Sequence, residues 1–133
     1  AYEIGGRLVG SEMCKETVRD VQEAAANGNE RAQLALDIFF RRVIAYIGRY
    51  FIALGGVDAI CFTAGIGENS FFARKEICNL LAEALGIEID DDANVNGKGD
   101  RLISTPNSKV KVYVIPTNEE LVIARDTKRL LNL

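Results

Sequence analysis

Residues 61–70, CFTAGIGENS, place two glycines, an acid and an amide where a short apolar run meets a helical pattern. The apolar run that leads into this stretch and overlaps its start, residues 57–65, contains β-branched and aromatic residues. It predicts a strand that is buried on both faces. The pattern after it predicts a helix over residues 70–85, which Gly86 ends. A plain turn from strand to helix needs one glycine at most, so the second glycine asks for an explanation.

The rest of the chain continues this alternation of helices and strands. Apolar spacing predicts helices over residues 15–26, 30–54 and 118–131, and the apolar flank of Ala35 and Ile38 predicts that the first half of the second helix is buried on two sides. Residues 109–116 alternate as a strand, residues 87–89 form a brief strand, and residues 90–101 have the composition of an exposed turn. The order predicts an α/β fold in which helices cover a sheet.

Two loops follow predicted strands, TAGIGENS at residues 63–70 and IPTNEEL at residues 115–121. In open α/β sheets, ligands bind beyond the carboxyl ends of the strands. We therefore expect both loops to lie at one edge of the same sheet and to form a site there.

The first loop has two interpretations. Gly65 and Gly67 let a phosphate or nucleotide approach the backbone, Asn69 or Ser70 caps the next helix, and the start of that helix offers N–H groups to a phosphate. Alternatively, the loop is a turn with a glycine for geometry and a helix cap. An isolated G-x-G does not decide between the two.

The second loop also has two interpretations. Thr117 and Glu120 fit the capping box T-x-x-E, in which Glu120 reaches back to the backbone of Thr117. Glu119 is explained either as an acid that favours the helix dipole or as a carboxylate beside Mg²⁺, which keeps several waters. Taken alone, the residues favour the first explanation.

Composition excludes several classes of function. The chain has 133 residues, a net charge of −3 and no basic stripe, so we expect no nucleic-acid partner. We also expect no membrane association, because no apolar stretch is long enough to span a bilayer and no signal peptide opens the chain. The chain has no histidine, which excludes a serine-hydrolase triad within it. Cys61 and Cys78 lie in apolar patterns and are expected in the core. Together with Cys14 they make three cysteines, an odd number without the spacing of metal ligands. This use of cysteine favours a reducing compartment, the cytoplasm.

Longer motifs carry a resemblance to a known family. The segments GNERAQLALDIF, YIGRYFIALGGVDAICFTAGIGENS, LGIEID and VYVIPTNEELVIARDTKRL resemble the C-terminal third of the bacterial acetate kinase family, from about Arg19 to the end. The resemblance implies a domain of the sugar kinase, heat-shock ATPase and actin superfamily, with a ribonuclease H-like mixed sheet flanked by helices. It divides the chain into a divergent or tag-like segment, residues 1–17, and a C-terminal nucleotide-binding domain, residues 18–133.

The resemblance also assigns roles to residues. It implies that Gly65, Ile66, Gly67, Glu68 and Asn69 bind the adenosine part of ATP or ADP and that Glu119 helps to hold Mg²⁺, while Glu120 remains the cap. Arg19 matches the arginine of an Asp-x-Arg motif that contacts nucleotide, and the aspartate of that motif falls on Thr17.

The resemblance further implies a cytoplasmic homodimer that converts acetate and ATP to acetyl phosphate and ADP, or the reverse. The family's catalytic histidine and substrate arginines belong to an N-terminal kinase domain that this sequence does not contain. We therefore expect no catalytic residue here and no activity from this chain alone. A propionate or butyrate kinase domain and a non-catalytic nucleotide-binding or dimerisation module remain the alternatives.

Overall fold

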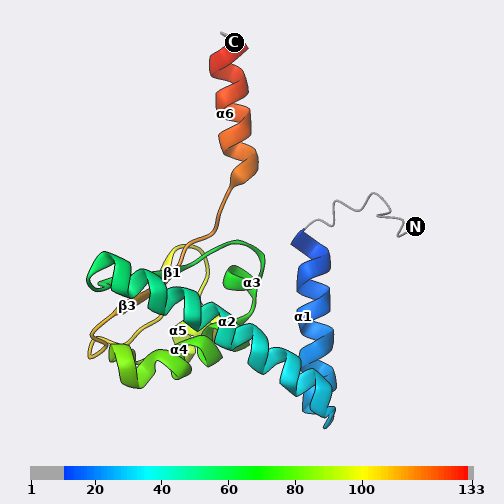
Figure 1. Cartoon of the computed structure of the whole chain (residues 1–133). Helices are drawn as coiled ribbons and strands as arrows, with labels where there is room; N and C mark the ends of the chain where they lie inside the picture. Colours follow the sequence, from blue (N-terminus) through cyan, green and yellow to red (C-terminus); the bar gives the residue numbers. More distant parts are fainter. Residues whose placement is uncertain (1–10, 132–133) are drawn as a thin grey trace.

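The computed structural model describes residues 11–131, with side chains at residues 18–118 and 120–131 (Figure 1). Two helices, α1 and α2, precede the first strand, and three shorter helices separate it from the other two strands. The elements are α1 Ser11–Ala26, α2 Glu30–Leu54, β1 Ala59–Phe62, α3 Ala64–Asn69, α4 Phe71–Leu85, α5 Asp91–Asn96, β2 Arg101–Leu102, β3 Lys111–Val114 and α6 Glu119–Leu131.

The sheet is small and mixed, with the strand order β1-β3-β2. β1 and β3 run parallel, so that Phe62 pairs with Val114 at their carboxyl ends, whereas β2 is antiparallel to β3. The backbone N–H of Ile115 donates to the carbonyl of Phe62 at 2.9 Å and extends this pairing. The two candidate loops therefore leave the same edge of one sheet, which confirms the expected α/β arrangement.

Local signals account for the boundaries of α2. Asn29 caps its start, because the side-chain oxygen accepts from the N–H groups of Arg31 and Ala32, and Gly55 ends it in the left-handed conformation at φ 74°. The prediction that its first half is buried on two sides is wrong. Ala35 and Ile38 are exposed, Ile38 by 57%, because no described element covers that flank.

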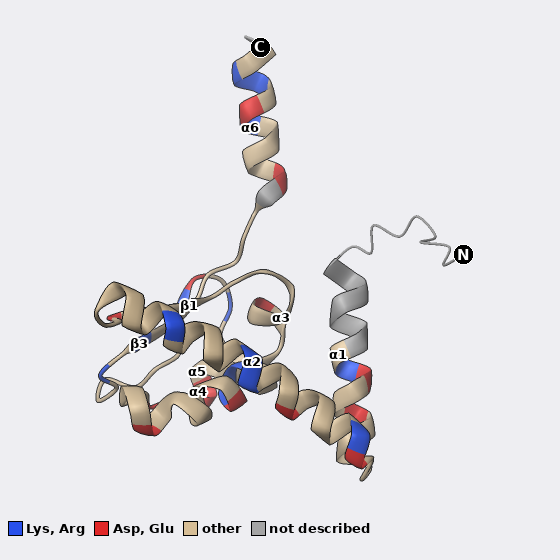
Figure 2. Cartoon of the chain, in the orientation of Figure 1, with Lys and Arg blue, Asp and Glu red and all other residues tan. Residues whose placement is uncertain are grey.

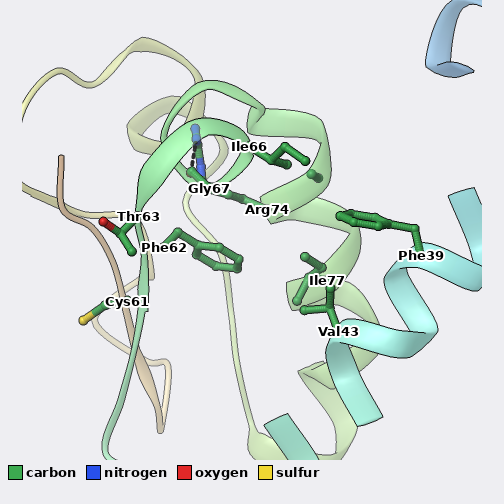
Figure 3. A pocket seen from close by; sticks show the side chains of 10 residues that line it. Phe39, Val43, Cys61, Phe62, Thr63, Ile66, Gly67, Arg74 and Ile77 are labelled. Atoms are coloured by element: carbon green, nitrogen blue, oxygen red, sulfur yellow. Dashed lines mark hydrogen bonds between the residues drawn. The ribbon is translucent and has the colours of Figure 1, made fainter. Parts of the chain in front are cut away.

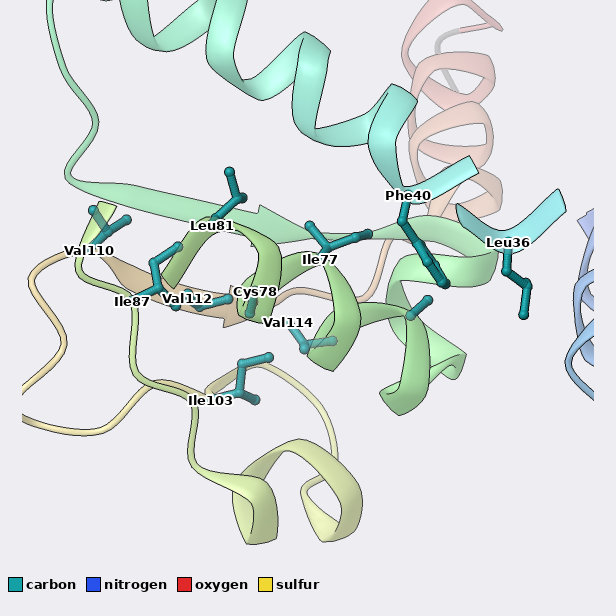
Figure 4. Close-up of a cluster of buried hydrophobic side chains, with 11 residues drawn as sticks. Leu36, Phe40, Ile77, Cys78, Leu81, Ile87, Ile103, Val110, Val112 and Val114 are labelled. Carbon is teal, nitrogen blue, oxygen red and sulfur yellow. The ribbon is translucent and has the colours of Figure 1, made fainter. Parts of the chain in front are cut away.

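The core joins α2, α4 and the sheet. Val110, Val112 and Val114 point inward, as their alternation predicts, and Cys78 of α4 lies among them (Figure 4). The prediction for β1 is wrong on one face: Cys61 is exposed, because no described element covers the side of the strand that carries it.

The segment expected to be an exposed turn contains α5 instead. Asp90 caps this helix, since its Oδ1 accepts from the N–H of Ala93 at 3.0 Å. Asp91 and Asp92 occupy the first turn, where acids favour the helix dipole. Asn94, on the inner side, is fully buried. Acidic turn residues thus start a helix here, and the segment contributes a polar residue to the interior.

α6 stands apart from the sheet, at the end of an extended connection (Figure 1). Its apolar residues are exposed, including Leu121, Val122, Ile123 and Leu130. Lys and Arg are distributed over several elements rather than gathered into one stripe (Figure 2). Among the described residues, no helix has the length and apolar character that a bilayer-spanning segment requires.

Candidate functional site

The glycine-rich stretch after β1 is the short helix α3 rather than an open loop. Thr63 is extended, and the chain then turns sharply at Ala64, which has a φ of 56°. Only glycine adopts this left-handed conformation without a steric cost, so the turn at Ala64 is strained. At the junction of β1 and α3, the residue with a positive φ is therefore Ala64 and not a glycine.

Gly67 meets a different requirement. Its φ is not in the left-handed region, and a Cβ built on it would lie 3.3 Å from the backbone carbonyl carbon of Phe62. α3 therefore packs so closely on the end of β1 that a side chain at residue 67 would be crowded. Gly67 is therefore not a turn glycine with positive φ. The neighbour that requires a glycine here is the chain's own strand, and the approach of a ligand to Gly67 stays a prediction.

The start of α4 is closed by a side-chain cap. The Oγ atom of Ser70 accepts from the N–H of Ala73 at 3.1 Å, which confirms Ser70 as the cap. Asn69 instead donates to the carbonyl of Gly65 at 2.8 Å. The cap occupies one of the first N–H groups of α4, and binding of a phosphate at the others stays a prediction.

The second loop contacts the first. Glu68 Oε1 accepts from both the N–H and the Oγ1 of Thr117, at 2.8 and 3.0 Å. The predicted capping box is wrong, because the Oδ1 atom of Asn118 caps α6 by accepting from the N–H of Leu121 at 2.9 Å. Thr117 is thus free to bind Glu68, and this contact joins the two loops across 49 positions of sequence.

Arg74 is a site residue that sequence reasoning missed. It lies on α4, is only 2% exposed, and donates to the carbonyls of Gly67 and Glu68 and to Asn94. Burial, with Arg101 as the next cause, lowers the pKa of Arg74 to about 10, so the guanidinium is charged at neutral pH. A signal for it was present in the sequence, because Arg74 lies three, four and seven positions before Ile77, Cys78 and Leu81, on the buried face of α4.

An apolar pocket of about 250 Å³ lies between α2 and the end of β1. Phe62, Ile66 and Ile77 point into it, and Phe39 and Val43 of α2 close the opposite side (Figure 3). The side chains of Cys61 and Thr63 point to the other side of the strand. The pocket therefore adjoins α3 and suits a flat apolar group better than a phosphate.

The arrangement can be compared with known proteins. A model of the acetokinase family matches residues 6–125. The chain belongs to the acetokinase family. An acetate kinase from Pseudothermotoga lettingae is 50% identical over 125 residues, which is 93% of this chain and 30% of that protein. The family match begins at residue 6, within the segment that the sequence predicts to be divergent.

Solved acetokinase structures share the fold. The crystal structure of Porphyromonas gingivalis acetate kinase matches with a TM-score of 0.73 and 43% identity, over 86% of this chain and 29% of that one. A propionate kinase from Francisella tularensis matches with a TM-score of 0.71 and 39% identity, over 82% of this chain and 27% of that one. The chain thus spans about 30% of the length of these acetokinases.

Two predicted acetokinase positions lie outside the loop contact. Arg19 is exposed on α1, and α1 and α3 are neighbours in space. Glu119 is the first residue of α6, two positions after Thr117, and its side chain lies outside the described residues. Within residues 18–118 and 120–131, no three potential metal ligands cluster. A Mg²⁺ ion that is held by one carboxylate, waters and phosphates needs no such cluster.

Proposed function

We propose that this chain is the C-terminal nucleotide-binding domain of an acetate kinase, an enzyme that transfers the γ-phosphoryl group of ATP to acetate, giving acetyl phosphate and ADP, or the reverse. The observation that carries the proposal is the contact between Glu68 and Thr117. It joins the two motifs that the family resemblance associates with nucleotide and with metal. Both motifs leave the edge of the sheet where α/β folds bind ligands.

The site is divided between the nucleoside and the phosphates. Gly65 to Asn69 lie in α3, beside an apolar pocket that would receive an adenosine group. The phosphates would lie toward Arg19 and Glu119. Glu119 would hold Mg²⁺ directly or through its waters, and the ion would supply positive charge beside the phosphates.

This chain would bind nucleotide without turning it over. Phosphoryl transfer depends on charge and positioning on both sides of the moving group. The resemblance assigns the acetate side, with its histidine and arginines, to an N-terminal domain. We propose that the whole enzyme is a cytoplasmic homodimer.

The test combines calorimetric titration with a turnover assay. The 133-residue chain should bind MgATP, should bind it more weakly when Mg²⁺ is chelated, and should form no acetyl phosphate from ATP and acetate. A chain that does not bind ATP would refute the domain assignment. A full-length protein that binds ATP but produces no acyl phosphate would support the non-catalytic module.

A propionate kinase is the second candidate, because the Francisella tularensis propionate kinase shares this fold at 39% identity. Acyl-chain selectivity would reside in the N-terminal part. Measuring kcat/KM for acetate, propionate and butyrate in the full-length protein would decide between them.

A further inference from the structure

Arg74 is buried, and no acidic side chain among the described residues pairs with it. Its Nε donates to Asn94 Oδ1 at 2.7 Å, its Nη2 to the Asn94 carbonyl at 2.6 Å, and its Nη1 to the carbonyls of Gly67 and Glu68, both at 2.9 Å. All four acceptors are oxygens of neutral groups. A buried charge is costly, and here it is stabilised by oriented dipoles rather than by a carboxylate.

These bonds complete the end of α3. The last carbonyls of a helix have no partner within it. Here the Gly65 carbonyl accepts from Asn69 Nδ2 at 2.8 Å and the Ile66 carbonyl from the N–H of Ser70 at 3.0 Å, while Arg74 Nη1 binds the next two. Four consecutive carbonyls are thus satisfied, two of them by one guanidinium nitrogen.

α3 needs such support because little else stabilises it. It has six residues, no side-chain cap at Thr63 and a strained first residue in Ala64. Isolated helices of this length do not persist in water. Arg74 is held in turn by Asn94, which is fully buried and whose Nδ2 donates to the carbonyl of Phe71 at 3.0 Å. A rigid polar group behind α3 therefore fixes the backbone that faces the pocket.

We propose that Arg74, held by Asn94, is a positioning residue for the nucleotide, because it fixes the α3 backbone in the conformation that receives the nucleoside. This inference rests on the proposed function for its ligand. An ordinary role in stability would affect the whole domain, whereas the hydrogen bonds of Arg74 should order α3 alone. Long-range attraction of phosphates would depend only on the positive charge, whereas the proposed role depends on the geometry of these hydrogen bonds.

Arg74→Lys and Arg74→Met separate these possibilities. Lysine keeps the charge but cannot reproduce the planar four-way contact, and methionine keeps only the apolar stem. Ile103→Ala is the matched control, since Ile103 is as deeply buried but lies next to β3, where its N–H donates to the carbonyl of Val112, and it makes none of the bonds of Arg74. Should Arg74→Met fail to fold, Asn94→Ala removes one acceptor and is measured in the same way.

The first measurement is amide hydrogen exchange of the 133-residue chain without nucleotide. The N–H of Ser70 donates to Ile66, and that of Lys111 donates to Asp58 at the other end of the sheet. In both Arg74 variants, exchange at Ser70 should accelerate at least about tenfold relative to Lys111, and in Ile103→Ala the ratio should not change. Equal acceleration at both amides, or no acceleration at Ser70, would overturn the proposal.

The second measurement is the Kd for MgATP of the same variants, at a temperature where each is folded. Both Arg74 variants should bind MgATP about 10-fold more weakly or worse, whereas Ile103→Ala should bind it as the parent does. The factor is taken from metal sites, where substitution of a residue that orients a ligand weakens binding by about 10-fold or more. Unchanged affinity in Arg74→Lys, or in both variants despite faster exchange at Ser70, would overturn the positioning role. If the parent chain binds no ATP, the proposed function fails. The exchange rate of the Ser70 amide still tests, independently of ATP, whether Arg74 stabilises α3.

Discussion

The contact between Glu68 and Thr117 can be tested by a double-mutant cycle. Glu68→Ala removes the acceptor of both hydrogen bonds, whereas Thr117→Val removes only the hydroxyl donor and keeps the backbone N–H and the side-chain shape. The cycle is needed because Glu68 makes a further interaction, which a single substitution would also remove. The coupling free energy between the two substitutions isolates the bond between Thr117 Oγ1 and Glu68 Oε1.

The geometry sets the expected magnitude. The bond is 3.0 Å long and its acceptor is a carboxylate, which strengthens it, but Thr117 is exposed, so water competes for both partners. We therefore expect a coupling of about 0.5–1.5 kcal/mol, the net value of an ordinary hydrogen bond. The single substitution Glu68→Ala should cost more than this coupling, because it also removes the bond to the N–H of Thr117.

The assay is urea unfolding of the four variants, followed by circular dichroism and fitted with one m-value. Thr63→Val is the matched control, since Thr63 is a nearby threonine whose side chain makes no cap at the start of α3. Combined with Glu68→Ala, Thr63→Val should be additive. A coupling between Glu68 and Thr117 below about 0.3 kcal/mol, the usual scatter for independent sites, would refute the contact.

Three further outcomes are expected. Gly67→Ala should lower the free energy of unfolding by about 1–3 kcal/mol in urea titrations, because its Cβ would crowd the backbone of Phe62, and Gly67→Asn should be no better tolerated. Asn118→Ala should lower helicity in circular dichroism through the loss of a cap worth about 0.5–2 kcal/mol, whereas Glu120→Ala should leave it nearly unchanged; equal losses would contradict the assigned cap. Burial raises the pKa of the Cys78 thiol from 9.0 to about 12, so between these pH values the thiol ionises in the unfolded chain but not in the folded one. The free energy of unfolding should therefore fall as the pH rises from 9 to about 12, and Cys78→Ala should lose this contribution.

Features set by neighbouring residues could be predicted from the sequence. The limits of α2 follow from the Asn29 cap, the apolar period and Gly55, all of which act within a few residues. Val110, Val112 and Val114 reveal the buried face of β3 because side chains alternate along a strand. The common edge of the two loops follows from parallel pairing of the strands that precede them.

Features set by distant polar contacts could not be predicted. Arg74 lies on the buried face of α4, three and four positions before Ile77 and Cys78, but the sequence does not show which groups satisfy a buried guanidinium. Its partner Asn94 lies 20 positions away, in a short segment without an apolar period. Thr117 and Asn118 are both good caps, and the choice of Asn118 depends on Glu68, which occupies Thr117 from another loop. For the same reason, the segment with Asp90 to Asp92 looked like a solvated turn: the helix that it starts is anchored by a buried asparagine whose partners lie on α4.

The parallel pairing of β1 with β3 bears on the order in which the site assembles during folding. All of α4, α5 and β2 lie between the two strands, and the bond between Glu68 and Thr117 spans 49 positions. Closing a flexible loop of that length costs about 3–4 kcal/mol of chain entropy before the contact forms. On the ribosome, α3 is synthesised before Thr117. The edge that would receive nucleotide is therefore completed only after Thr117 has been made, and it should form later than the contacts within α2 and α4.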